Sequence, residues 1–195
     1  MSNTVSLEDL SDLMARQRAV RRFTNEDVDD RTIERLIRAA TRAPSARNLQ
    51  PWRFIVVRNE ETKRALGSIF DELGNRMYGA EAPDRTPWGE VPVLIAICSE
   101  YAFGTRAGGI AALDASIYPA VQNLLLAVQA AGLGAVLTTR WKEREADVRP
   151  LLGLPETMAI HAILPIGHPQ ERHGRNKRLP VRDVTSRECF GEPWS

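Results

Sequence analysis

The longest apolar stretch of the chain, from Leu113 to Ala131, places the strongest constraint on its fold. Alanine, leucine, isoleucine and valine dominate this stretch, and Asp114 is its one charged residue. A helix over it would be apolar nearly all round and therefore buried on most sides, in the core of one chain or of a dimer. Pro119 lies inside the stretch and would kink the second turn of a helix that begins near Asp114, or mark the true start of the helix.

Shorter predicted elements flank this stretch on both sides. Apolar residues at helical spacing predict helices at residues 6–18, 62–74 and 143–152. A further helix is expected to begin at Asp30, as its N-cap, and to end at the Ala43-Pro44 step. Short runs rich in branched residues predict strands at 54–57, 93–98, 135–139 and 158–166, the first of them buried. The elements alternate without strict βαβ order, which favours an α+β layered domain over a doubly wound sheet. With 195 residues, 43% of them hydrophobic, the chain can bury such a core as one domain.

The charge balance and the cysteines narrow the class of partner and the compartment. Lys and Arg total 26 and Asp and Glu total 25, a net charge of +1, so no overall field attracts nucleic acid or an anionic membrane. Residues 1–13 lack a signal-like apolar region, and no run approaches the ~20 apolar residues of a membrane span. Cys98 and Cys189 stand apart and are expected to be reduced structural thiols. We therefore expect a cytoplasmic protein.

Several common sites are absent from the sequence. His161, His168 and His173 do not form a metal-binding spacing, so no metal is expected. No GxGxxG follows a predicted strand, and there is neither a phosphate-binding P-loop nor a GxSxG motif. These absences argue against a Rossmann dehydrogenase and against the simplest hydrolases.

The segment from Pro44 to Trp52 combines groups that suit a flat ligand with polar edges. Ser45, Arg47, Asn48 and Gln50 offer hydroxyl, guanidinium and amide groups between two prolines, next to a tryptophan. The alternative is an ordinary turn, because Pro-Ser and Gln-Pro steps commonly begin turns.

Two basic clusters could bind a phosphate. The first, Arg16, Arg18, Arg21 and Arg22, is expected at a helix end, where Arg18 and Arg21 or Arg22 would share one side; alternatively it only complements the helix dipole. The second comprises Arg172, Arg175, Lys177 and Arg178, and would otherwise be part of a solvated arm. That arm, about residues 170–195, ends in apolar residues from 189 to 194, so we expect it to dock on its own domain or on a partner subunit.

Taken in order, these motifs resemble the FMN-dependent nitroreductase family over nearly the whole chain. Residues 17–21 correspond to the family pattern RRSxR, 44–52 to APSxxNxQPW, 114–134 to the central helix and the turn after it, 152–156 to LGLPE, 165–169 to xxGxP, and 176–184 to KxRxPxxxV. Gln17, Ala19 and Asn176 depart from these patterns, which puts some phosphate contacts in doubt.

The resemblance implies particular site residues. Arg18 and Arg178 would bind the FMN phosphate, Arg21 would lie near the pyrimidine edge of the flavin, and backbone at 137–139 would face the ring, although threonine hydroxyls there could instead satisfy strand ends. The implied cofactor-binding residues are Gln17, Arg18, Ala19, Arg21, Pro44, Ser45, Asn48, Gln50, Leu137, Thr138, Thr139 and Arg178. The candidates for substrate binding are Arg47, Trp88, Tyr101, Phe103 and Ser116. Loops at 79–89 and 101–109 would determine the acceptor.

The resemblance also implies architecture and activity. The fold would be a three-layer α+β sandwich, with helices on both faces of a mostly antiparallel sheet, forming a homodimer with FMN at the interface and the arm crossing to the partner. NADH or NADPH would reduce FMN, which would then reduce a nitroaromatic, a quinone or an activated alkene; no protein acid, base or other catalytic residue is assigned. Two alternatives stay open: a flavin-binding protein with little turnover, and a same-fold enzyme of flavin destruction, dehydrogenation or reductive dehalogenation.

Overall fold

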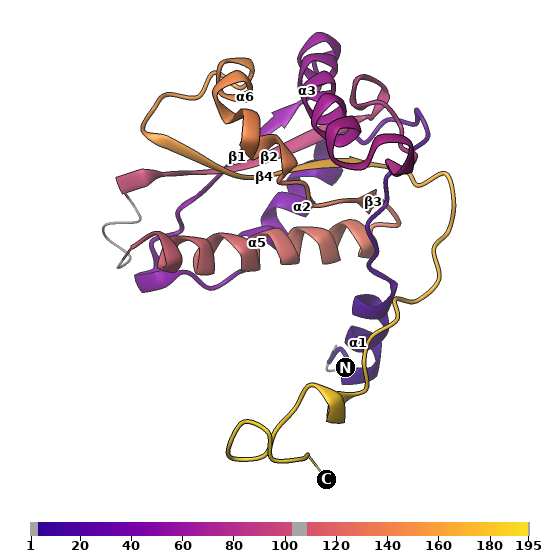
Figure 1. The fold of residues 1–195 in the computed structure, drawn as a ribbon, viewed down its shortest axis with the longest axis vertical. Helices are drawn as coiled ribbons and strands as arrows, with labels where there is room; N and C mark the ends of the chain where they lie inside the picture. Colours follow the sequence, from indigo (N-terminus) through magenta and orange to yellow (C-terminus); the bar gives the residue numbers. More distant parts are fainter. Residues whose placement is uncertain (1–3, 103–108, 195) are drawn as a thin grey trace.

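A four-stranded antiparallel sheet organises the protein. The computed structural model describes residues 4–102 and 109–194. The strands lie in the order β1-β2-β4-β3, and all three pairings are antiparallel (Figure 1). Their bounds are Trp52–Val57 for β1, Val93–Glu100 for β2, Gly134–Ala135 for β3 and Met158–Gly167 for β4. The sheet therefore agrees with the predicted antiparallel arrangement.

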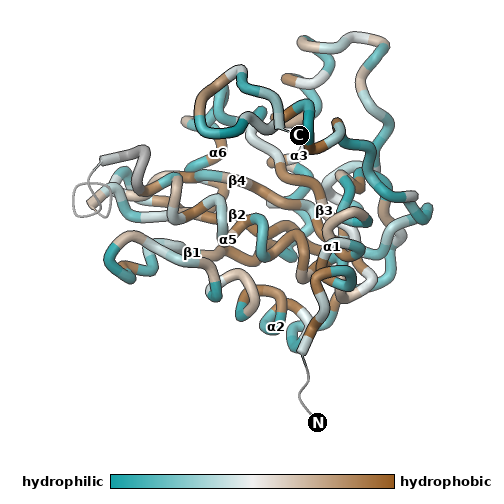
Figure 2. Tube along the Cα trace, turned by 90° about the horizontal axis from the view of Figure 1, so that it is seen from below, coloured by the Kyte–Doolittle hydropathy of each residue, from teal (hydrophilic) through white to brown (hydrophobic). Residues whose placement is uncertain are grey.

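Helices cover both faces of this sheet. One face carries α2 (Asp30–Ala40) and α5 (Ile110–Ala130), and the other carries α3 (Glu60–Tyr78) and α6 (Glu145–Leu151) (Figure 1). The three-layer prediction is confirmed. Figure 2 shows the apolar residues concentrated along the central strands and α5. No helix in the described ranges has both the length and the apolar character to cross a bilayer.

The alternation of side chains along β2 explains why two separate cores form. Val93, Ile95 and Ile97 belong to the core beneath α2 and α5. Leu94, Ala96 and Cys98 belong to the core beneath α3. Successive side chains of a strand point to opposite faces, so a strand buried on both faces reads as one continuous apolar run.

Several predicted boundaries need correction. The helix α5 begins at Ile110, earlier than Asp114, so Pro119 lies inside it and does not mark its start. The N-cap of α2 is Asp29 and not Asp30, because the Asp29 carboxylate accepts a hydrogen bond from Thr32 N at 2.8 Å. The strand β1 is only partly buried, since it lies at the sheet edge and its Val56 is exposed.

The basic segment after α1 is extended, and the prediction of a helix end there is wrong. The helix α1 (Leu7–Arg16) ends before Arg18. Ala19 pairs with Ala135 of β3, and Val20 N donates to Ala135 O at 3.0 Å. Gly134 permits this approach, because a Cβ there would lie 2.6 Å from Val20 Cγ1. Pairing with the sheet edge thus overrides the local helical tendency. The predicted strand 135–139 is correspondingly short, and beyond Ala135 only Thr138 makes an isolated bridge, to Ile163.

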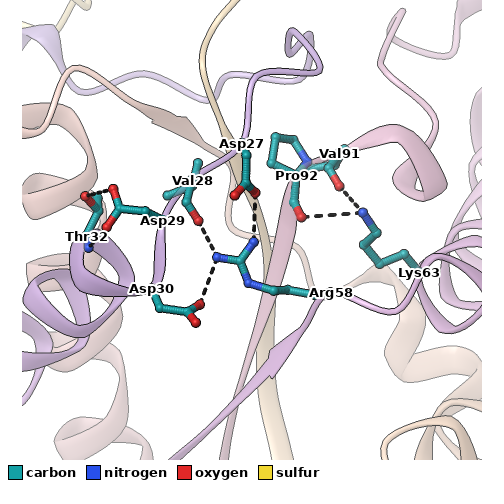
Figure 3. Close-up of polar contacts among 9 residues, drawn as sticks. All are labelled: Asp27, Val28, Asp29, Asp30, Thr32, Arg58, Lys63, Val91 and Pro92. Atoms are coloured by element: carbon teal, nitrogen blue, oxygen red, sulfur yellow. Dashed lines mark hydrogen bonds and ion pairs between the residues drawn. The ribbon is translucent and has the colours of Figure 1, made fainter.

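Figure 3 shows two cations that link neighbouring segments: Lys63, which is buried, and Arg58, which is partly exposed. The Arg58 guanidinium, just after β1, contacts Asp27 at 2.8 Å, Asp30 at 3.0 Å and the Val28 carbonyl, which fixes the start of α2. The Lys63 ammonium of α3 donates to the carbonyl oxygens of the two residues that precede β2. Burial lowers the pKa of Lys63.

The two ends of the chain run side by side away from the sandwich. Figure 1 shows the arm after β4 passing along α1, which lies below the sheet. None of the residues of α1 is buried, and the arm exposes Leu179, Val181, Val184 and Phe190. Exposed apolar side chains therefore lie on both segments.

Candidate functional site

The first cavity, which we call the basic cavity, lies between the segment after α1 and the start of the arm. It measures about 620 Å³. Its lining consists of Gln17, Arg18, Ala19, Arg21, Leu125, Val136, Leu137, Arg175, Asn176, Lys177 and Arg178. Arg18, Arg21, Lys177 and Arg178 form no ion pair within the part of the chain that the structure describes. A wall of cations without carboxylates is suited to bind a phosphate group.

Hydrogen bonds between the two chain ends hold this cavity together. The Arg18 guanidinium donates to the carbonyl oxygens of Gly174 at 3.4 Å and Arg175 at 3.3 Å. Asn176 donates from its backbone N to Ala15 O at 2.7 Å and from its side chain to Met14 O at 3.1 Å. Asn176 thus satisfies carbonyl groups at the end of α1, a structural role that a lysine or arginine would fill with different geometry.

The second cavity, which we call the aromatic cavity, adjoins the first. It measures about 340 Å³ and shares Arg21, Val136 and Leu137 with the basic cavity. Its other lining residues are Phe23, Phe70, Met77, Tyr78, Pro83, Arg85, Thr86, Trp88, Thr138, Thr139, Arg140, Lys142, Glu143 and Pro165. The rings of Phe70 and Trp88 stack with centroids 4.6 Å apart. The pair of cavities offers a charged end and an aromatic end along one continuous surface.

The segment 44–50 lines neither cavity. Its Ala46 N donates to the hydroxyl of Ser116 on α5 at 3.1 Å. Leu125, which lines the basic cavity, follows Ser116 by nine residues on the same helix, about 13 Å at the usual rise. Pro44, Ser45, Asn48 and Gln50 are therefore separated from Arg18 and Arg178 within one chain.

The backbone of this segment is strained. Arg47, Asn48 and Gln50 have φ values of 52°, 55° and 49°, in the left-handed region that non-glycine residues seldom adopt. Strain of this kind costs of the order of 1–3 kcal/mol per residue, and it gathers at ligand-binding sites. Gln50 N is held by the Ser45 hydroxyl at 3.1 Å. The role of this segment in binding stays a prediction.

The predicted substrate residues do not gather in one place. Trp88 is 3% exposed and lines the aromatic cavity. Arg47 and Ser116 lie at the contact between 44–50 and α5, and Tyr101 lies exposed after β2. None of these three lines either cavity, and Phe103 lies outside the described residues.

One predicted residue, Thr138, uses its hydroxyl within the protein. The hydroxyl donates to Ile163 O at 2.6 Å and so satisfies the end of a strand, which was the alternative for this residue.

The aromatic cavity also contains cations that the sequence did not predict. These are Arg85, Arg140 and Lys142. A usable signal for Arg140 and Lys142 was their position one and three residues after Thr139, since loop residues that follow a strand commonly carry binding side chains.

The comparison with known families decides the classification. A profile of the nitroreductase family matches residues 14–168. The chain belongs to the nitroreductase family. It is 32% identical to a Methanothermobacter thermautotrophicus protein named NADH dehydrogenase/NAD(P)H nitroreductase, over 87% of this chain and 82% of that one. It is also 30% identical to the iodotyrosine deiodinase of Thermotoga neapolitana, over 88% and 95%.

Solved structures agree with this assignment. The structure of iodotyrosine deiodinase bound to FMN and 3-iodo-L-tyrosine superposes with a TM-score of 0.75 at 27% identity, covering 93% of this chain and 99% of that one. A Desulfovibrio desulfuricans protein of the nitroreductase family, solved in complex with FMN, gives 0.71 at 26%, covering 96% and 99%. The family resemblance and the fold inferred from the sequence are thus confirmed for this chain.

A buried histidine network lies outside both cavities. His161 of β4 is 5% exposed; its Nε2 lies 2.8 Å from Ser99 Oγ and its Nδ1 lies 2.9 Å from Asp114 Oδ1. These three residue types can form a nucleophilic triad, but Ser99 is fully buried and has no route to a substrate. The network therefore stabilises the contact between the strands and α5.

The same network gives the stability a defined pH dependence. Burial lowers the pKa of His161, against the opposing hydrogen bond and charge of Asp114. Because the unfolded histidine binds a proton near pH 6.5 and the folded one only at lower pH, the free energy of unfolding should fall as the pH drops from about 6.5 through the folded pKa. Urea unfolding across pH 4.5–8 measures this slope, and His161→Asn should flatten it. His173→Asn, which removes an exposed histidine of the arm, is the control; a slope that His161→Asn leaves unchanged would refute the assignment.

Proposed function

We propose that this nitroreductase is an FMN-dependent oxidoreductase that uses NADH or NADPH to reduce a nitroaromatic, a quinone or another activated acceptor, with residues 1–195 acting as one domain. The basic cavity carries the proposal, because Arg18 and Arg178, 160 positions apart in the chain, line the same space. Family relatives that bind FMN support it.

The donor set of the two cavities fits FMN. Arg18, Lys177 and Arg178 would hold the phosphate, and Arg21, at the junction of the cavities, would face the pyrimidine edge. FMN held there would supply the two-electron redox chemistry between NAD(P)H and the acceptor. The Arg21 guanidinium would favour negative charge on a ring edge placed beside it. Leu137 and the following threonines would supply backbone contacts.

A second copy of the chain would complete the site. The segment 44–50 is separated from the basic cavity in one chain, although its strained backbone suits a ligand. In a homodimer with FMN at the interface, this segment would reach the cofactor of the partner subunit. The apolar residues exposed on α1 and on the arm would be covered by the same contact.

The state of the cysteines supports a cytoplasmic site of action. Cys98 and Cys189 are both free. Burial raises the pKa of the Cys98 thiol to about 12, so it is an unreactive core residue. Free thiols are typical of the reducing compartment in which NADH and NADPH are available.

Absorbance spectroscopy tests the proposal. The purified protein should show flavin bands that bleach on anaerobic addition of NADH or NADPH and return on addition of a nitroaromatic or a quinone. A colourless protein that does not bind added FMN would overturn the cofactor assignment. Bound flavin that neither donor bleaches would favour the alternative of a flavin-binding protein with little turnover.

Reductive dehalogenation is the second candidate. It is favoured by the identity of 30% to iodotyrosine deiodinase over most of both chains. Iodide release from 3-iodotyrosine by the reduced protein would establish it. Reduction of nitroaromatics without iodide release would leave the first candidate alone.

A further inference from the structure

We propose that the aromatic cavity selects acceptors that carry a carboxylate on an aromatic ring. This inference rests on the proposed function and names the substrate class for the same site. It follows from the rings of the cavity, from its uncompensated cations and from the position of Arg140 between two of those rings.

The walls of the cavity are shaped for a ring. Phe70 and Trp88 stack at an interplanar angle of 22°, and Tyr78 and Met77 contribute further apolar surface. A volume of about 340 Å³ has room for one substituted ring. Aromatic side chains attract another ring through offset or edge contacts.

The charges of the cavity are unbalanced. Among its lining residues, Arg85 pairs with Asp71, and Glu143 pairs with Arg76. Besides Arg21 at the junction with the basic cavity, Arg140 and Lys142 have no ion pair in the described residues. Two cations beside aromatic walls would attract an anion far more than a neutral molecule of the same size.

Arg140 is the residue that most clearly indicates a ligand. Its guanidinium lies 4.6 Å from the centroid of Phe70 and 5.0 Å from that of Tyr78. Its Nη1 is buried and lacks a hydrogen-bond partner among the residues that the structure describes. A Cβ at Gly74 would lie 2.3 Å from Nη1, so the glycine makes room for the guanidinium. The buried Nη1 packs against Gly74 and anchors the side chain, while the rest of the half-buried guanidinium, held between two rings, lines the cavity where a carboxylate could bind.

The phosphate of FMN does not account for these cations. Arg18, Lys177 and Arg178 line the basic cavity and not the aromatic one, whereas Arg140 and Lys142 line only the aromatic cavity. The two sets of charge would thus serve different groups, and the second set would face an acceptor bound in the aromatic cavity.

Matched acceptors and matched inert ligands test this specificity. In the FMN-loaded protein, kcat/KM should be about tenfold higher for 4-nitrobenzoate than for 4-nitrobenzamide, the size expected for one added charge-assisted contact. Calorimetry should show the same preference for benzoate over benzamide, which measures binding without turnover. Arg140→Gln should abolish most of the preference in both experiments, Lys142→Gln should reduce it, and Arg140→Lys should restore part of it.

The controls separate this inference from the proposed function. Arg64→Gln changes an exposed arginine of α3 that pairs with Glu60 outside the cavity, and should keep the wild-type ratio. Equal binding of benzoate and benzamide by the wild-type protein would overturn the inference, as would FMN loss in Arg140→Gln, because that would assign the guanidinium to the cofactor. If the protein prefers benzoate but oxidises neither NADH nor NADPH, the anion site is supported and only the oxidoreductase proposal is overturned.

Discussion

Replacing Arg178 with alanine is expected to raise the dissociation constant for FMN about 10- to 100-fold. Hydrogen bonds to charged groups contribute about 1.5–3 kcal/mol, and 1.4 kcal/mol corresponds to a factor of ten. Arg178 lines the basic cavity, and its guanidinium donates only to the adjacent Lys177 carbonyl at 2.9 Å within the described residues, so it is available for a phosphate. Quenching of FMN fluorescence during titration of the flavin-free protein measures the constant directly.

The control for this experiment lies on the same arm. Arg182→Ala removes an exposed arginine that pairs with Asp183 and does not line the cavity. Its FMN affinity should match that of the wild type. The difference between the wild type and Arg178→Ala should shrink as salt is added, because screening weakens the charge contribution. Equal affinities for the wild type and Arg178→Ala at low salt would place the phosphate away from this arginine.

The sequence predicts the layers well because the periodicity of apolar residues records them directly. The runs 93–98 and 158–166 became the two central strands, and the apolar stretch 113–131 became α5. The order of the motifs along the chain matched that of the nitroreductase family and so indicated the fold. Where the sequence misled, a tertiary contact was the cause: Arg18 and Arg21 lie on an extended segment because Ala19 pairs with Ala135.

The site was only partly predictable, because its residues meet through the fold. Arg18 donates hydrogen bonds to the carbonyl groups of residues 174 and 175, close in the chain to Arg178. No local sequence pattern reveals this contact. The aromatic cavity draws on α3, on the segment before β2 and on residues after β3. The cofactor assignments to Ser45 and Asn48 stay predictions, since they depend on a second copy of the chain.

Removing the arm after Arg178 is expected to convert the proposed dimer into a monomer. Leu179 is 69% exposed and Phe190 is 103% exposed, and Val181 and Val184 are similarly open. Burial of three of these four side chains at about 1.5 kcal/mol each amounts to roughly 4.5 kcal/mol, or more than about a thousandfold in the dissociation constant of the dimer. Sedimentation velocity over a range of concentrations measures this change.

The truncation also separates the two contributions to FMN binding. The shortened chain keeps Arg18 and Arg178, so a weaker affinity for FMN would reflect the loss of the segment 44–50 from the partner subunit. The full-length variant Arg182→Ser/Glu188→Ser, which changes exposed polar residues of the arm, should remain dimeric and keep its flavin. Because the truncated side chains contribute little to the sandwich, its circular dichroism should match that of the wild type. A truncated protein that sediments as a dimer would show that α1 and the sheet domain form the interface without the arm.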